Sequence, residues 1–163
     1  MRLLALNAAA LLVIALSADA GYATANIVPS SRAGLFVHGT VANDLKPAQC
    51  AALNLSTIVT GDGNLAGTRR SDLIIGGPAA QTLTGAGGDD CLIGGGGDDM
   101  LRGGKGDDVL IAGPGDDDLD GANGADTLYG GDGDDNLDGG KQTDACYGGA
   151  GTDTFKKCES WVQ

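Results

Sequence analysis

The chain has 163 residues, a length typical of one domain. Thirty residues are glycine, and the formal net charge is −12. A charge of this sign disfavours nucleic acid and anionic membrane surfaces as partners, and it favours cations.

Residues 1–25 are predicted to be a secretory signal peptide. Arg2 supplies a minimal charged region, residues 3–16 are almost entirely apolar, and small residues allow cleavage after Ala20 or after Ala25. The alternative is an uncleaved anchor, for which the apolar run is short. We therefore predict a secreted, extracellular protein without stable membrane insertion.

Residues 26–66 do not repeat and are too few to form an independent domain. Residues 35–41 are expected to form a strand, residues 47–55 a short helix and residues 56–59 an extended segment. His38, the only histidine, lies in the apolar first run, so we expect it to pack rather than to catalyse. The whole segment is predicted to cap the region that follows.

Residues 67–156 repeat every nine residues, in ten copies that start at residue 67. The consensus repeat has glycine at positions 1, 2 and 4, an acid at position 6 and an apolar residue at position 8. Residues 94–102 and residues 103–111 both follow it. Gln81 is the one departure at position 6, and position 8 is apolar throughout. The aspartates at position 6 are Asp72, Asp90, Asp99, Asp108, Asp117, Asp126, Asp135, Asp144 and Asp153.

This nonapeptide resembles the calcium-binding repeat of the RTX, or hemolysin-type, family. The resemblance covers residues 67–156 and is weakest in the first two repeats, where residues 67–70 lack two of the three glycines and Gln81 replaces the acid. It implies an all-β fold, a parallel β-roll in which two repeats make one coil. Ten repeats then make about five coils, and residues 157–163 form a C-terminal cap.

The resemblance also implies where calcium binds. Glycine turns can direct backbone carbonyls inward, and calcium takes about six to eight oxygen ligands. Acids one coil apart share a site, so we predict about six or seven ions in two columns, with a weak position at Gln81. The glycines expected to contribute carbonyls are Gly95, Gly97, Gly104, Gly106, Gly113, Gly115, Gly131 and Gly133.

A competing interpretation is that the aspartates only solubilise turns. It does not explain why they recur at one phase together with the glycines. Ten inward apolar residues offer little stabilisation, and the closely spaced acids repel one another. We therefore expect the repeat region to be largely disordered without calcium and to fold when calcium binds.

One outer face of the coil is predicted to be apolar. It is formed by positions 7 and 9 of alternate repeats, which we name the apolar stripe: Leu73, Ile75, Cys91, Ile93, Val109, Ile111, Thr127, Tyr129, Ala145 and Tyr147. A soluble coil should not leave such a face bare. We expect residues 35–59 to cover it, with Tyr129 and Tyr147 as the exposed part; the alternative is a partner or self-association surface.

The four cysteines allow three pairings, and their spacing does not choose among them. Covering of the stripe favours Cys50–Cys91 as the staple. Cys146–Cys158 would then pin the tail to the last coil. Disulfides are plausible in an exported protein.

No feature of the chain indicates an enzyme. The cysteines lack zinc spacing, and nothing large enough to be a catalytic domain remains beside the repeats. We predict a non-enzymatic calcium-binding protein, similar to small exported repeat proteins of bacteria. The alternatives are a calcium-dependent cell-surface adhesion module and an enzyme acting on polysaccharide, for which the only extra acids are Asp118, Asp120, Asp132 and Asp138.

Overall fold

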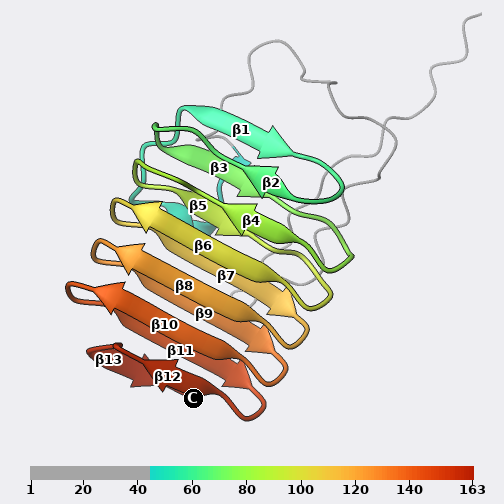
Figure 1. Ribbon diagram of the computed structural model, residues 1–163, viewed down its shortest axis with the longest axis vertical. Coiled ribbons are helices and arrows are strands. Elements are labelled where there is room, and N and C mark those ends of the chain that lie inside the picture. Colours follow the sequence, from blue (N-terminus) through green and yellow to red (C-terminus); the bar gives the residue numbers. More distant parts are fainter. Residues whose placement is uncertain (1–44) are drawn as a thin grey trace, which may run out of the picture.

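The computed structural model describes residues 45–163. The predicted signal peptide, the expected strand at residues 35–41 and His38 lie outside this range. The described chain winds into two parallel β-sheets that form the front and back of a flat coil (Figure 1). In that part of the chain, no helix is long and apolar enough to span a membrane.

Strands of odd number form a seven-stranded sheet and strands of even number a six-stranded sheet. The first sheet holds β1 (Thr57–Thr60), β3 (Asp72–Ile75), β5 (Cys91–Ile93), β7 (Val109–Pro114), β9 (Thr127–Asp132), β11 (Ala145–Ala150) and β13 (Ser160–Val162). The second holds β2 (Leu65–Ala66), β4 (Thr82–Thr84), β6 (Met100–Lys105), β8 (Asp118–Asn123), β10 (Asn136–Lys141) and β12 (Thr154–Lys156). The predicted all-β parallel roll is confirmed.

The coil has about six turns, one more than predicted. The additional turn comes from β1 and β2, which precede the first repeat recognised in the sequence. Leu65 pairs in register with Leu83, eighteen residues later, so it occupies the inward apolar position of a further, glycine-poor repeat. Val59 and Leu65 both pack against the core.

The core is a double row of position-8 side chains between the sheets. They are completely buried from β3 to β11. Successive residues of a strand point to opposite faces, so one apolar residue in the middle of each strand is enough to fill this narrow interior. The buried residues are Ile74, Leu83, Leu92, Leu101, Leu110, Leu119, Leu128, Leu137 and Cys146.

The apolar stripe is covered by the chain's own N-terminal segment, as predicted. Cys50 and Leu55 are buried against the stripe, and Leu45 and Leu53 pack beside them. The Cys50–Cys91 disulfide is present. The uncovered end lies at Tyr147, which is 39% exposed and stacks on Tyr129 with ring centroids 4.9 Å apart.

The helix expected at residues 47–55 is reduced to one turn of 3₁₀-helix, η1 (Ala48–Cys50). The Lys46 ammonium donates hydrogen bonds to the carbonyls of Ala51 and Leu53, which a longer helix would pair with backbone N–H groups. The segment that follows is extended and leads into β1.

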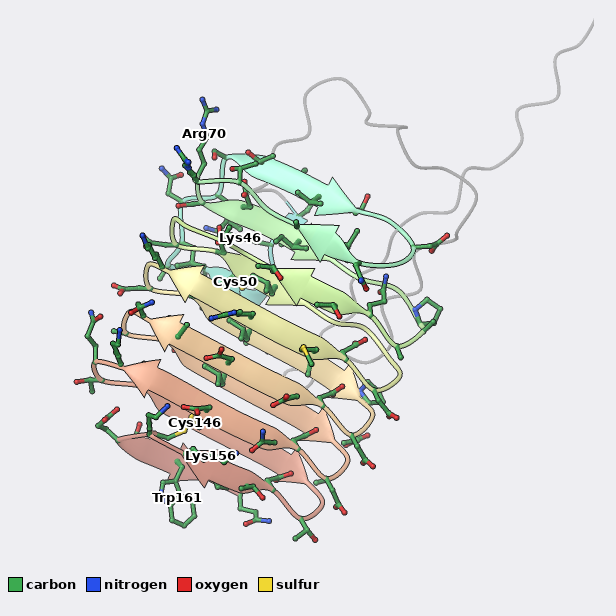
Figure 2. All side chains as sticks on the ribbon, in the orientation of Figure 1. Lys46, Cys50, Arg70, Cys146, Lys156 and Trp161 are labelled. Atoms are coloured by element: carbon green, nitrogen blue, oxygen red, sulfur yellow. A yellow bond between two sulfur atoms is a disulfide. The ribbon has the colours of Figure 1, made fainter. Side chains whose placement is uncertain are left out.

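The tail closes the last coil through the Cys146–Cys158 disulfide, the second predicted pairing. Its strand β13 adds to the first sheet beside β11. Trp161 on β13 is 60% exposed and stacks on Phe155 at 5.2 Å. Figure 2 shows Trp161 projecting from the C-terminal end of the coil.

Candidate metal sites in the turns

The position-6 residues form two columns, one along each row of turns. Each column steps by one coil, as the eighteen-residue register predicts. Asp72, Asp90, Asp108, Asp126 and Asp144 make the first column; Gln81, Asp99, Asp117, Asp135 and Asp153 make the second. All except Asp153 are at most 7% exposed. The turns therefore bury carboxyl groups that a merely solubilising role would leave in water.

From Asp90 onward, one oxygen of each column carboxylate joins adjacent coils. Asp108 Oδ1 accepts a hydrogen bond from the backbone N–H of Asp90 at 2.7 Å, and Asp126 Oδ1 accepts one from Asp108 at 2.8 Å. The same bond recurs along both columns at 2.7–3.0 Å. This geometry orients each side chain and leaves its second oxygen directed elsewhere.

The second oxygen is buried and has no hydrogen-bond partner within residues 45–163. A buried carboxylate oxygen without a partner is costly, and a cation would offset that cost. Within the same range, no three Asp, Glu, His or Cys side chains gather at one point. A metal ion here would therefore take its remaining ligands from backbone carbonyls. The unpartnered atoms are Asp72 Oδ1 and the Oδ2 atoms of Asp90, Asp99, Asp108, Asp117, Asp126, Asp135, Asp144 and Asp153.

The glycines at positions 2 and 4 let the turns of adjacent coils stack closely. Gly113 has φ +126°, and a methyl group on it would collide with the carbonyl oxygen of Gly95 one coil earlier. Gly131 meets Gly113 in the same way. Only glycine allows both this backbone conformation and this close approach. All eight glycines predicted as ligands have positive φ: Gly95, Gly97, Gly104, Gly106, Gly113, Gly115, Gly131 and Gly133.

Burial raises the pKa of six column aspartates far above the ordinary value. The pKa rises to about 8 for Asp108, to about 7 for Asp90 and Asp117, and to about 6 for Asp99, Asp126 and Asp135. Hydrogen bonds from the backbone lower the pKa, and neighbouring carboxylates raise it further. The turns thus hold negative charge poorly until a cation is present.

Protein groups occupy part of the first turn of each column. Gln81 Nε2 donates to the carbonyls of Gly63 at 2.6 Å and of Gly61 at 3.3 Å. In the other column, the Thr68 hydroxyl donates to Asp72 Oδ2 at 2.9 Å. The weakness expected at Gln81 thus has a structural cause: its amide occupies the carbonyls of the preceding turn.

A second set of aspartates, at position 5, was not assigned a role from the sequence. These side chains also accept backbone N–H groups, but from the coil that follows rather than the one before. Asp89 Oδ1 accepts from Asp107 at 3.0 Å. The repeated Asp-Asp doublet is the signal that marks them. The residues are Asp89, Asp98, Asp107, Asp116 and Asp134.

The extra acids considered for an enzyme lie apart from these columns. Asp118 accepts from the Asn136 amide at 2.7 Å, Asp120 pairs with Arg102 at 3.4 Å, and Asp138 pairs with Lys157 at 3.0 Å. These three lie on the outer face of the second sheet, whereas Asp132 ends β9 of the first sheet. The structure does not gather the four into one group.

Comparison with known protein families finds the RTX calcium-binding nonapeptide repeat. Its model matches four times, at residues 57–92, 66–101, 93–128 and 120–155. The first match begins at β1, in agreement with the additional coil. No curated protein and no solved structure shows significant similarity to the chain.

Proposed function

Because the chain belongs to the RTX calcium-binding nonapeptide repeat family, we propose that it is a secreted, non-enzymatic protein that folds around calcium. The family implies calcium binding. The observation that carries the proposal is the row of buried carboxylate oxygens without hydrogen-bond partners. Calcium prefers such oxygen ligands, and it supplies the positive charge that the turns lack.

Each ion would be held between two coils. The ligands would be consecutive aspartates of one column, such as Asp108 and Asp126, together with glycine carbonyls of the same turns, at positions 1, 2 and 4. We infer about six or seven ions from the gaps between acids in the two columns. The turn in front of Gln81 is excluded, because its amide already satisfies the carbonyls there.

Export is supported by two features. The N-terminal sequence is typical of a signal peptide, and the two disulfides are typical of an oxidising compartment. Extracellular calcium sites usually work at about 10⁻⁴–10⁻³ M. The chain would therefore stay unfolded where calcium is scarce and would fold after it leaves the cell.

Calcium titration of metal-free protein tests the proposal. We expect the far-ultraviolet circular dichroism to change from disordered to β-rich at millimolar calcium, and calorimetry to count about six or seven ions. Magnesium should be much less effective, because it loses its water reluctantly. A β-rich spectrum that calcium does not change, with no heat of binding, would refute the proposal.

A role in cell-surface adhesion is the second candidate. It is supported by the aromatic and aliphatic side chains left exposed at the C-terminal end: Tyr147, Trp161 and Val162. Such side chains are enriched at interfaces. Calcium-dependent retention of the protein on cell-wall or matrix material, lost when Trp161 is replaced by alanine, would support this role.

A further inference from the structure

The tail shortens the last coil by three residues. Residues 157–159 connect β12 to β13, and β12 has three residues where β10 and β11 have six. β13 nevertheless continues the first sheet, with Ser160 opposite Ala145, fifteen rather than eighteen residues later. Glu159 consequently occupies the place just before the strand, where the repeats carry their position-6 aspartate.

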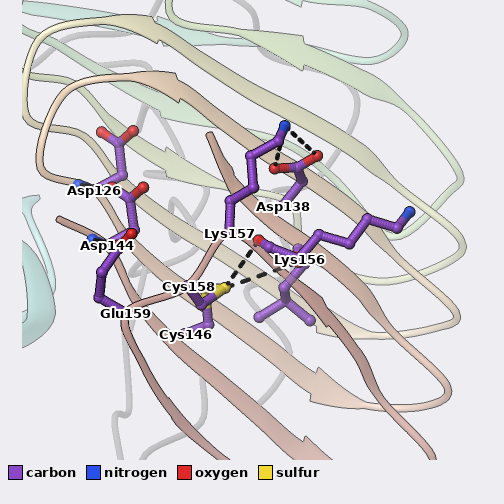
Figure 3. Close-up of a disulfide and its surroundings, with 9 residues drawn as sticks. Asp126, Asp138, Asp144, Cys146, Lys156, Lys157, Cys158 and Glu159 are labelled. Atoms are coloured by element: carbon purple, nitrogen blue, oxygen red, sulfur yellow. Dashed lines mark hydrogen bonds and ion pairs between the residues drawn. A yellow bond between two sulfur atoms is a disulfide. The ribbon is translucent and has the colours of Figure 1, made fainter. Parts of the chain in front are cut away.

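The Glu159 carboxylate makes the same contact as the aspartates of the first column. Glu159 Oε2 accepts the backbone N–H of Asp144 at 2.7 Å, and Asp144 Oδ1 accepts that of Asp126 at 2.8 Å. Figure 3 shows the three acids following one another along the column. Glutamate has one methylene more than aspartate, which gives it additional reach across a connection three residues shorter.

A backbone carbonyl of the tail also takes the place of a glycine carbonyl. A methyl group built on Gly121 would lie 2.5 Å from the carbonyl oxygen of Gly139, one coil later. A methyl group built on Gly139 would meet the carbonyl oxygen of Lys157 in the same way, and it would lie 2.7 Å from Asp144 Oδ2. The Lys157 carbonyl and Asp144 Oδ2 therefore converge on one small region.

Asp144 independently indicates that this region binds a cation. Its residue is 1% exposed, and its Oδ2 atom has no hydrogen-bond partner among the described residues. The positive charge of Lys157 does not neutralise it, because the ammonium pairs with Asp138 on β10, at 3.0 Å.

We propose that Asp144, Glu159 and the carbonyl of Lys157 form one further calcium site at the end of the first column. The matched repeats end at residue 155, so Glu159 lies outside the nonapeptide pattern. Cys158 separates the two tail ligands, and its disulfide to Cys146 holds them against the last coil. The inference rests on the proposed function, since it requires that the columns bind calcium.

Glu159→Gln tests the site in the full, oxidised protein. Glutamine keeps an oxygen that can accept the Asp144 N–H, but it removes the charge. We expect calorimetry with calcium chloride to count one ion fewer, with the other sites unchanged. Asp138→Asn is the matched control: it removes a carboxylate at the same end and breaks the Lys157 ion pair, and it should keep the full count.

The wild-type protein offers a second readout, because Glu159 is its only glutamate. Labelling glutamate with ¹³C gives one side-chain carboxyl resonance, which should shift as calcium saturates the last site. An unshifted resonance, or an unchanged ion count in Glu159→Gln, would overturn the inference while leaving the other sites intact. A wild-type protein that binds no calcium would overturn the proposed function as well.

Discussion

Lowering the pH should partly replace calcium in folding the coil. Six buried aspartates have a pKa of about 6 to 8 in the folded chain, against about 3.9 in an unfolded one. Their pKa is raised by folding, so the folded, metal-free chain binds more protons. Its stability is therefore complete below about pH 4, and it is lost as the pH rises through about 6 to 8.

The size of the effect follows from the number of groups. Each proton bound only by the folded chain changes the free energy of unfolding by about 1.4 kcal/mol per pH unit. Six independent aspartates would give about 8 kcal/mol per pH unit. Repulsion along a column spreads the titration, and water reaches the turns, so we expect roughly 3 kcal/mol per pH unit. That still suffices to fold a marginal domain within two units.

The measurement is circular dichroism of metal-free protein between pH 8 and pH 5. Calcium should be removed on a chelating resin, because soluble chelators weaken in acid. The protein must be dilute, since the isoelectric point is near 4.1. We expect β-structure to grow as the pH falls without calcium, and calcium to be released as the pH falls in its presence. A metal-free spectrum that is constant over this range, or more ordered at pH 8, would refute the reasoning.

Three substitutions test other parts of the coil. Gly113→Ala should cost about 1–3 kcal/mol of unfolding free energy in urea, because φ is positive there. Gly96→Ala should be nearly neutral, since its methyl group would meet nothing closer than 3.9 Å; equal losses would contradict the argument. Removing the Cys50–Cys91 bridge, which spans 41 residues, should cost about 4 kcal/mol in calcium, and an unchanged urea midpoint would count against the staple. Gln81→Asp should add one ion by calorimetry, and an unchanged count would show that its amide does not keep calcium out.

The nine-residue period, together with the resemblance to the RTX repeat, was enough to predict the roll, its two columns and the inward row. A solenoid repeats one set of neighbours, so a residue such as Leu110 meets the same kind of partner in every coil. The difference between the two outer faces of the coil also predicted contacts that occur only once in the chain. The apolar stripe predicted the covering segment, and the Cys50–Cys91 bridge followed from it.

The period did not predict the strands that join the coil outside the repeats. β1 joins the sheet fifteen residues before its partner, with Thr57 opposite Asp72, and β13 is displaced by the same interval. A strict nine-residue frame passes over both. Glu159 was overlooked because its equivalence to Asp144 appears only once the shortened connection is seen.

Where a repeat carries the Asp-Asp doublet, its two aspartates bond to the coils on both sides. Position 6 bonds back to the preceding coil and position 5 forward to the next, as Asp108 and Asp107 do. Loss of order in one turn therefore destabilises both neighbouring coils. Unfolding should then spread from coil to coil, starting at the less stable end. One disulfide joins Cys50 to β5, and the other joins Cys158 to β11. The middle coils lie between the two disulfides, so calcium has the greatest influence on whether those coils fold.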